Sequence, residues 1–284
     1  MILIADSGST KTDWRVIKDT GEILQARTQG LNPFFKTTED CKVTFMQELL
    51  PQMEEVGVYE ITEIWFYGAG CSSAEKCRII EDAFTAVFTK AKVNIDHDLL
   101  GAARALCGGS PGIAGILGTG SNSCYFDGSK IVKNVTALGY ILGDEGSGSQ
   151  IGKTLIKDYL DHEVPNSLKD RFDKKFGYTK EQLLDEVYIG ELPNRFLASF
   201  AKWIFQIKDQ EKYAKDLIES CLESFLNKHI SKYEQYQEVP LHIVGSVGFY
   251  NKAILVALCE AKGIKLDMVI ETPIAALTLF HSKG

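Results

Sequence analysis

The chain carries the same order of predicted elements twice, and this repeat limits the fold more than any other feature of the sequence. Three short apolar runs separated by turn residues span about residues 2–29, and a second set of three spans about 113–135. Short apolar runs bounded by glycine, asparagine or aspartate predict strands joined by hairpins. Each set therefore predicts a three-stranded meander, and the duplication predicts two related lobes.

Helices and strands alternate after each meander. After the first, the pattern predicts a helix from about 33 to 56, a strand at 61–67, a helix at 73–90, a strand at 92–95 and a helix at 98–106. After the second, a helical insertion at about 147–238 precedes a strand at 241–244, a helix at 249–262, a strand at 264–269 and a helix at 273–282.

Without the insertion, both halves follow the order βββαβα. Meanders joined to crossover helices predict an α/β fold with mixed sheets flanked by helices, one sheet in each lobe. We expect an N-terminal lobe at 1–112, a C-terminal lobe at 113–284 that carries the insertion, and a ligand cleft between them.

Bulk properties narrow the class of partner. With 284 residues, 45% of them apolar, the chain is long enough for two lobes that each bury a core. A net charge of −7 disfavours nucleic acid or an anionic membrane as main partner, because either calls for a basic face. No apolar run reaches the roughly 18–20 residues of a membrane-spanning helix. The opening residues are typical of a strand rather than of a signal peptide.

The cysteines and histidines show no metal pattern. The seven cysteines are an odd number without a CxxC pair, and none of the five histidines lies in an HExxH pattern. Such cysteines are typical of reduced, buried thiols in a cytoplasmic protein. We therefore expect a cytoplasmic protein whose partners include neither nucleic acid nor a membrane.

The first meander contains a turn whose residue types suit an anion. It reads DSGSTKTD from Asp6 to Asp13. Glycine lets backbone N–H groups curl around a phosphate, hydroxyl side chains add donors, and a carboxylate beside them can hold hydrated Mg²⁺. A hairpin that merely needs turn residues is the alternative. The chemistry predicts a water-mediated Mg²⁺ contact at Asp6 and an ATP-binding role for Gly8, Ser9, Thr10, Lys11 and Thr12.

Two further glycine-rich turns strengthen the nucleotide interpretation. LGTGSNS at 117–123 lies at the matching point of the second meander, and VGSVG at 244–248 follows a strand and opens a helix. Backbone donors at such a helix start suit the adenosine half of a nucleotide. The three turns in this order predict an ATP site that includes Gly118, Thr119, Gly120, Ser121, Gly245, Ser246 and Val247.

One string resembles a Walker A loop without meeting its requirements. GSQIGKT at 148–154 has three residues between its glycines, where four are required, and no strand precedes it. We expect it to form the first turns of an amphipathic helix that continues to Tyr159.

These motifs resemble those of the actin, sugar-kinase and heat-shock-chaperone ATPase (ASKHA) superfamily and, within it, the BadF/BcrA-type family that includes N-acetylglucosamine kinase. The most specific string is GYILGDEGS at 139–147, and the resemblance spans nearly the whole chain. It implies a two-lobed actin-like ATPase (ribonuclease H-like) fold that uses ATP and Mg²⁺. The implied reaction moves the γ-phosphoryl group to a hydroxyl, the 6-OH, of N-acetylglucosamine or a related N-acetylated amino sugar. The resemblance is also compatible with a homodimer.

The resemblance assigns roles to single residues as well. Asp98 opens the string DLLG, which matches the family's helix start with the general base. Its ordinary pKa near 3.9 would leave it ionised at neutral pH, whereas Asp96 still belongs to the strand end. The family's sugar contacts carry over to Asn32, Gly120, Asn122, Gly139, Tyr140 and Asp144. At Tyr140 the chain departs from mammalian-type relatives, which have tryptophan there.

Each of these side chains also has an ordinary structural interpretation. Asp98 could cap the helix that follows it. Asn32 could form a loop before proline, Tyr140 could be a core aromatic residue, and Asp144 could be a turn residue. Two other functions also compete with a kinase. One is an ATP-driven activator of an acyl-CoA dehydratase or reductase, although the cysteines show no iron–sulfur pattern. The other is a non-catalytic nucleotide sensor, against which Asp98 argues.

Overall fold

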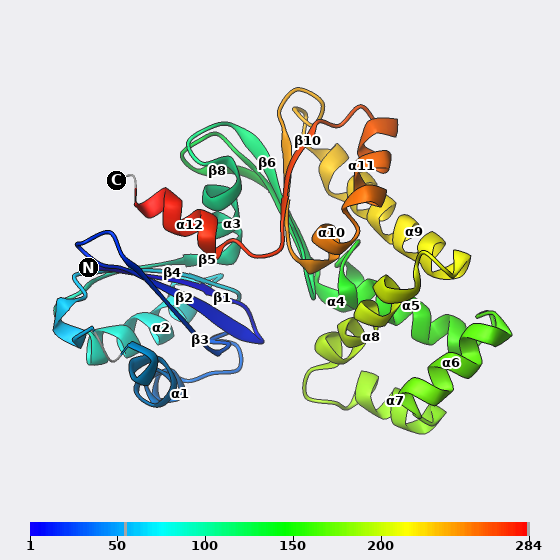
Figure 1. Ribbon diagram of the computed structural model, residues 1–284, viewed down its shortest axis with the longest axis horizontal. Helices are drawn as coiled ribbons and strands as arrows, with labels where there is room; N and C mark the ends of the chain where they lie inside the picture. Colours follow the sequence, from blue (N-terminus) through cyan, green and yellow to red (C-terminus); the bar gives the residue numbers. More distant parts are fainter. Residues whose placement is uncertain (54–55, 283–284) are drawn as a thin grey trace. The chain divides into compact units, whose positions relative to one another are not determined.

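The computed structural model describes residues 1–53 and 56–282, which divide into two compact units (Figure 1). The first unit contains residues 1–110, 128–130 and the chain from 272 onward, and the second contains 111–127 and 131–271. No helix in the described ranges is long and apolar enough to cross a membrane.

The first unit is built on a five-stranded mixed sheet with strand order β3-β2-β1-β4-β5. The central strand β1 pairs antiparallel with β2 and parallel with β4. The meander is thus as predicted. Its strands are β1 (Ile2–Ser7), β2 (Lys11–Ile17), β3 (Ile23–Gln29), β4 (Glu63–Gly68) and β5 (Lys92–His97), and its helices include α1 (Thr38–Thr44), α2 (Ala74–Val87) and α3 (Asp98–Cys107).

The long helix predicted from about 33 to 56 is broken. α1 continues into a π-helical turn (Phe45–Leu49) and a 3₁₀ turn (Leu50–Met53), and a second 3₁₀ turn spans Val58–Glu60. Pro51 lies inside the first 3₁₀ turn, and proline has no N–H with which to continue an α-helix. Residues 54 and 55 of the predicted helix lie outside the described residues.

Strand β1 is buried on both faces. Leu3 and Ala5 point into a core that includes Trp14, Phe45 and Phe84. Ile4, on the opposite face because side chains alternate along a strand, packs in a smaller cluster with Tyr67, Ile274 and Leu277. Burial on both faces fixes the position of the turn that follows β1.

The second unit repeats this topology. Its sheet has the order β10-β9-β6-β7-β8, which matches the first sheet strand for strand. Its strands are β6 (Gly112–Leu117), β7 (Ser121–Phe126), β8 (Ile131–Val135), β9 (Leu241–Val244) and β10 (Leu266–Ile270). Two mixed sheets with one connectivity confirm the predicted duplicated α/β fold.

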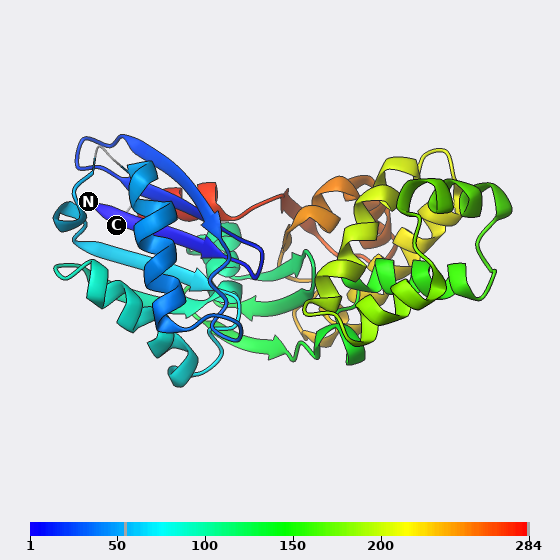
Figure 2. The same ribbon diagram turned by 90° about the horizontal axis from the view of Figure 1, so that it is seen from below.

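The insertion consists of helices that form one group, coloured green to yellow in Figures 1 and 2. They are α5 (Gly148–Leu160), α6 (Asn166–Phe176), α7 (Lys180–Tyr188), α8 (Pro193–Ile207) and α9 (Lys212–Lys228), followed by a 3₁₀ turn at Ile230–Lys232. The short helix α4 (Gly139–Leu142) precedes the insertion. The backbones of α5 and α8 approach closely, since a Cβ at Gly152 would lie 1.8 Å from the Leu197 carbonyl oxygen. Only glycine fits there.

The single helix predicted at 249–262 is two helices, α10 (Ser246–Tyr250) and α11 (Lys252–Ala261). They meet at Asn251, whose side-chain amide donates to the Val247 carbonyl oxygen at 2.8 Å. A short polar side chain that bonds the backbone in this way competes with the helical hydrogen bond.

Helix α12 (Ile274–His281) returns to the first unit and packs on α3, β1 and β2. The Tyr67 hydroxyl links the two helices, because it accepts from Arg104 of α3 at 2.7 Å and lies 2.9 Å from His281 Nε2. The predicted division into lobes at 1–112 and 113–284 does not include this return of the chain to the first unit.

Candidate active site

The first predicted phosphate loop is a tight turn between β1 and β2. The Gly8 N–H donates to the Lys11 carbonyl oxygen at 2.9 Å. Gly30 supports the turn, since its N–H donates to Thr10 O at 3.1 Å and a Cβ there would lie 2.4 Å from Gly8 O. The turn therefore has a fixed shape before any ligand binds.

Two hydroxyl groups of this segment face inward. Ser7 and Thr12 are buried, and their hydroxyl oxygens are 2.8 Å apart. Thr12 also donates to Gln29 O, and Ser7 accepts from the Leu31 N–H. The Thr12 hydroxyl therefore holds the hairpin together, whereas Gly8, Ser9, Thr10 and Lys11 remain accessible.

The Lys11 ammonium is held by a buried carboxylate. Asp13 is 4% exposed and binds Lys11 Nζ at 2.8 Å and Arg27 Nε at 2.7 Å. Burial alone would raise the pKa of Asp13, but the hydrogen bonds and charges of Lys11 and Arg27 outweigh it and lower that pKa. The Lys11 ammonium is thus fixed next to the first predicted phosphate loop.

Asp6 and Asp98 are two further carboxylates of the first unit, and the negative charge of Asp98 acts on Asp6. Burial raises the pKa of Asp6 to about 7, with further contributions from the negative charges of Asp98 and Asp13. Burial also raises the pKa of Asp98, partly offset by His97 and by backbone N–H groups at the start of α3. The expectation of an ordinary Asp98 pKa is wrong, because the sequence does not reveal how far the half-buried carboxyl group is removed from water.

Asp98 does not cap α3. The N-cap is His97, whose Nδ1 accepts from the Leu100 N–H at 3.1 Å, and Asp98 is the first helical residue. The Asp96 side chain is 40% exposed and accepts from the His97 N–H. His97 is therefore the N-cap, while the Asp98 carboxylate interacts with the N–H groups of Asp98 and Leu99 in the first turn of the helix.

Asn32 joins the loop after β3 to the phosphate-type turn. It is 8% exposed, donates to Ser9 Oγ at 2.8 Å and accepts from the Phe34 N–H at 2.9 Å. A Cβ at Gly70 would lie 2.2 Å from its Oδ1. Asn32 therefore shapes its own loop, as the ordinary interpretation expected, and also positions Ser9.

The second and third predicted turns come together in the second unit. Gly245 has φ +124°, and a Cβ there would lie 2.2 Å from Leu117 O, so only glycine lets the backbones approach this closely. Gly148 N–H and Ser149 N–H, at the start of α5, donate to Gly118 O and Thr119 O. The Walker-like string is thus the start of a helix, as predicted. Its lysine, Lys153, donates to the Tyr140 carbonyl oxygen.

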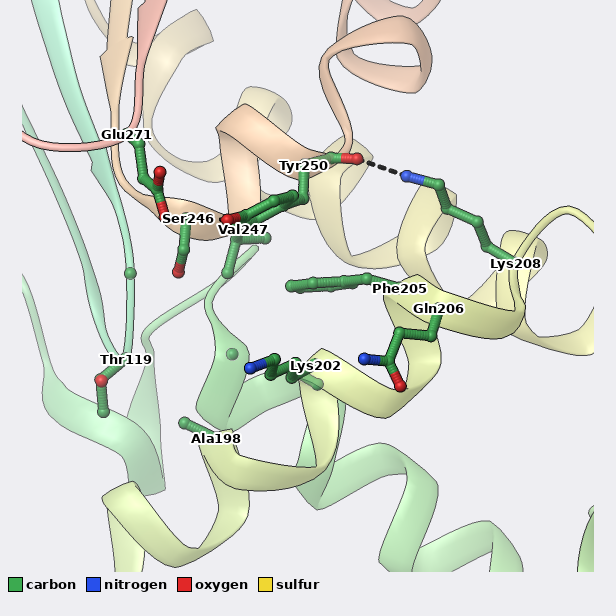
Figure 3. Close-up of a pocket in the computed structure, with 13 residues that line it drawn as sticks. Thr119, Ala198, Lys202, Phe205, Gln206, Lys208, Ser246, Val247, Tyr250 and Glu271 are labelled. Carbon is green, nitrogen blue, oxygen red and sulfur yellow. Dashed lines mark hydrogen bonds between the residues drawn. The ribbon is translucent and has the colours of Figure 1, made fainter. Parts of the chain in front are cut away.

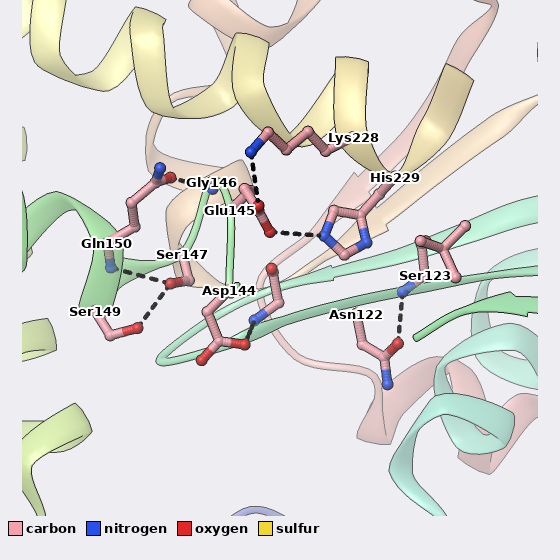
Figure 4. Close-up of polar contacts among 12 residues, drawn as sticks. Asn122, Ser123, Asp144, Glu145, Gly146, Ser147, Ser149, Gln150, Lys228 and His229 are labelled. Carbon is pink, nitrogen blue, oxygen red and sulfur yellow. Dashed lines mark hydrogen bonds and ion pairs between the residues drawn. The ribbon is translucent and has the colours of Figure 1, made fainter. Parts of the chain in front are cut away.

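The family-specific string folds back onto the second turn (Figure 4). Asp144 is buried and left-handed (φ 58°), and its Oδ1 accepts from the Ser121 N–H at 3.2 Å. Burial raises its pKa, and the Ser121 N–H partly offsets that. A Cβ at Gly120 would lie 2.9 Å from Asp144 Oδ2. Asp144 and Gly120 therefore lie side by side, and their role as sugar contacts stays a prediction.

An ion-pair network supports this turn from α9 (Figure 4). Glu145 contacts His229 Nε2 at 3.1 Å and Lys228 Nζ at 3.4 Å. The next residue, Gly146, donates to Gln150 Oε1 at 2.6 Å. The sequence does not reveal this network, because Glu145 lies more than eighty residues from Lys228 and His229.

The remaining predicted sugar contacts, Asn122, Gly139 and Tyr140, differ from one another in their surroundings. Asn122 Oδ1 accepts from Asn134 Nδ2 and from the Ser123 N–H, both at 2.9 Å. Gly139 has φ +73° and opens α4. Tyr140 is half-buried and packs against the core of the second unit, as its ordinary interpretation expected.

A pocket of about 430 Å³ lies beside the second and third turns (Figure 3). Four of its residues belong to the predicted ATP site: Gly118, Thr119, Ser246 and Val247. Sequence reasoning missed the others, which are Gly148, Ala198, Ala201, Lys202, Phe205, Gln206, Lys208, Tyr250 and Glu271. The pocket thus combines two predicted turns with a wall that the sequence did not reveal.

Comparisons with known proteins agree with this architecture. The crystal structure of a candidate N-acetylglucosamine kinase from Porphyromonas gingivalis is 38% identical, has a TM-score of 0.94, and the match covers 100% of this chain and 99% of that one. A ROK family glucokinase from Streptomyces griseus, solved with glucose and AMPPNP, is 14% identical with a TM-score of 0.62 over 99% of this chain and 98% of its own, which supports the fold alone.

A curated relative matches part of the chain. The N-acetylmuramic acid/N-acetylglucosamine kinase of Clostridium acetobutylicum is 32% identical over 165 residues, which is 55% of this chain and 52% of that protein. The match therefore spans about half of the relative's length. The family model for BadF/BadG/BcrA/BcrD ATPases matches residues 5–270. With that match and a sugar-kinase structure that aligns along the whole chain, the predicted actin-like ATPase fold is confirmed, and the chain belongs to the BadF/BadG/BcrA/BcrD ATPase family.

Proposed function

We propose that this protein is an ATP-dependent kinase that phosphorylates a hydroxyl, the 6-OH, of N-acetylglucosamine or a related N-acetylated amino sugar. Membership of an ATPase family supports ATP as the donor. The names of the Porphyromonas and Clostridium relatives support an amino sugar as the acceptor. One observation carries the proposal: Asp98 is a half-buried carboxylate with a raised pKa that is not the N-cap of α3, in the unit that also holds the first phosphate-type turn.

In the proposed reaction, Asp98 accepts the proton of the sugar hydroxyl while that oxygen attacks the γ-phosphorus. A new P–O bond forms to the sugar, the bond to the β-phosphate oxygen breaks, and ADP leaves. A raised pKa makes Asp98 a stronger base than an exposed aspartate, which helps proton transfer. Turns with accessible residues, such as Ser9 and Thr10, hold the phosphates in line, and positioning dominates such chemistry.

The proposal includes Mg²⁺ bound through water to Asp6. The neighbouring carboxylates that raise the pKa of Asp6 make a cation favourable there, and oxygen is the donor that Mg²⁺ prefers. In residues 1–53 and 56–282 no group of three or more His, Cys, Asp or Glu side chains is arranged to hold a metal. Magnesium commonly needs only one or two protein carboxylates besides phosphate and water, and when bound it would neutralise phosphate charge.

The proposed sugar contacts retain hydrogen-bonding capacity. The Asn32 amide uses one donor and one acceptor within the protein and keeps a second of each. Asp144 uses Oδ1 for the Ser121 N–H, and Oδ2 remains to accept from a sugar hydroxyl. Asn122, Gly120, Gly139 and Tyr140 complete the proposed set. A homodimer and a cytoplasmic location stay predictions.

An ADP-release assay with Mg-ATP and a panel of sugars tests the proposal. We expect N-acetylglucosamine or another N-acetylated amino sugar to give a larger kcat/KM than glucose. Equal values for N-acetylglucosamine and glucose would contradict the amino-sugar preference. If no sugar on the panel raises ADP release above the basal rate, the kinase proposal fails for that panel.

The burial of the thiols favours the kinase over the iron–sulfur activator. Of the seven cysteines, Cys77 is half-buried and the other six are buried. Burial raises the pKa of Cys41, Cys107, Cys221 and Cys259 to about 12, whereas a cluster ligand must be a thiolate. Purified protein that is brown and contains iron would overturn this choice.

A further inference from the structure

One face of α8, in the helical insertion, lines the pocket of the second unit (Figure 3). The lining residues of α8 are spaced by three, one, three and one: Ala198, Ala201, Lys202, Phe205 and Gln206. This spacing places side chains on one side of a helix. The other side of α8 is buried in the core through residues such as Phe200, Trp203 and Ile204. The helix is therefore held firmly while one face remains open to a ligand.

The charged side chains of this pocket differ in how they are paired. Lys208 donates to Tyr250 O and to Asn251 Oδ1, and Glu271 accepts from the Tyr250 hydroxyl at 3.0 Å. Lys202, by contrast, has no hydrogen-bond or ion-pair partner in the part of the chain that the structure describes, and Figure 3 shows it extending from α8 into the pocket. It is an unpaired cation in a pocket that also contains Gly118 and Thr119 of the second turn.

Aromatic and aliphatic groups form the rest of the wall. Phe205 is half-buried, and its ring lies in the same pocket as Val247 and Tyr250 (Figure 3). A flat ring facing an aliphatic and an aromatic side chain suits a planar apolar group such as a nucleobase. The pocket therefore contains a cationic group, Lys202, and an aromatic ring, Phe205, about one helical turn apart on α8.

We infer that the insertion supplies two nucleotide contacts that the repeated core lacks: Lys202 binds a phosphate of the nucleotide, and Phe205 packs against its base. An ammonium is attracted to a polyphosphate, and the turn at Gly118–Thr119 brings backbone groups to the same pocket. The inference rests on the proposed function in that ATP is taken as the nucleotide. It adds residues outside the glycine-rich turns.

Calorimetric titration of the whole protein with ATP, ADP and adenosine separates the two contacts. We expect Lys202→Met, which keeps the length of the side chain without its charge, to weaken ATP and ADP binding by about tenfold and to leave adenosine unchanged. Lys202→Arg should restore most of the loss. Lys215→Met, on the exposed surface of α9 and outside the pocket, makes the same change of net charge and should alter none of the three affinities.

Phe205 should behave differently. Phe205→Ala is expected to weaken ATP, ADP and adenosine by one common factor of about five- to thirtyfold, because the base is common to all three. Phe205→Leu keeps most of the packing volume and guards against a folding defect, and it should show the same pattern with a smaller loss. Melting temperatures of all variants check that they fold.

Three outcomes would overturn the inference while wild-type protein still binds ATP. The first is an unchanged ATP affinity in Lys202→Met. The second is an equal loss for adenosine and ATP in that variant, which would place Lys202 at the base. The third is a loss in Phe205→Leu confined to ATP and ADP. If wild-type protein binds neither ATP nor ADP, the proposed function itself fails, so the two failures are distinguishable.

Discussion

Nucleotide binding should release a proton from Asp6, and this is the sharpest test of the proposed metal site. In the free protein the pKa of Asp6 is about 7 because the side chain is enclosed near the charges of Asp98 and Asp13. A cation held beside it would favour the ionised form, so that pKa should fall when Mg-ATP binds. Binding then expels whatever proton Asp6 carried.

The pKa fixes the size of the effect. A group with a pKa of about 7 is about 90% protonated at pH 6, about half protonated at pH 7 and about 10% protonated at pH 8. Mg-ATP binding should therefore release about 0.9, 0.5 and 0.1 proton from Asp6 at these pH values. If only ionised Asp6 binds the metal, the apparent affinity at pH 6 is about tenfold weaker than at pH 8, or about 1.4 kcal/mol.

Calorimetry in buffers of different ionisation enthalpy measures the released protons directly. Asp6→Asn provides the control, because it keeps the shape of the side chain and subtracts protons released from ATP itself. We expect the variant to lose the pH-dependent part of the release and to bind Mg-ATP weakly at all three pH values. Equal proton release in wild type and Asp6→Asn would refute the reasoning, as would an Mg-ATP affinity that does not change with pH.

The same variant should fold well. A carboxyl group whose pKa is higher in the folded than in the unfolded protein lowers stability as the pH rises from about 4 to about 7. Removing that charge should leave the melting temperature of ligand-free Asp6→Asn at pH 8 equal to or above that of wild type. A large decrease would show instead that Asp6 has a structural role.

Three further predictions concern the base, the insertion and the turn at Glu145. Asp98→Asn should lower kcat by at least about a hundredfold with little change in ATP affinity, whereas Asp96→Asn should keep most activity in steady-state assays; the reverse result would make Asp98 the wrong base. Gly152→Ala should cost about 1–3 kcal/mol in thermal unfolding because its Cβ meets a carbonyl of α8, while Gly109→Ala, with open space around it, should change little. Glu145→Gln should raise KM for the sugar more than KM for ATP, because the contacts to α9 hold the turn beside it; an equal rise in both would contradict that role.

The repeat made the architecture predictable. The strands and turns of each βββαβα repeat follow from local sequence. Because both meanders are followed by the same order of helices and strands, few topologies remain that bury both faces of β1. The glycine of the third turn was also predictable, because Gly245 lies where another backbone leaves no room for a Cβ. Residue type and spacing report such constraints directly.

What the sequence did not reveal depends on contacts between distant segments. The raised pKa of Asp98 comes from enclosure, and no neighbour in the sequence records it. The Thr12 hydroxyl looked like a phosphate donor, but Gln29 O and Ser7 use it. Lys202 and Phe205 lie about eighty residues from Gly118 and read as ordinary positions of an amphipathic helix. A lysine and a phenylalanine at helical spacing beside two alanines were the available signal.

The return of α12 to the first unit affects how the chain folds during synthesis. Residues 1–110 leave the ribosome early, yet the face formed by Ile4 and Tyr67 is covered by Ile274 and Leu277, which follow the whole second unit. The nascent first unit must therefore keep an apolar face uncovered while about 160 further residues are made, at about 5–20 residues per second. A chaperone that shields apolar surface has an interval of roughly ten to thirty seconds in which to bind that face.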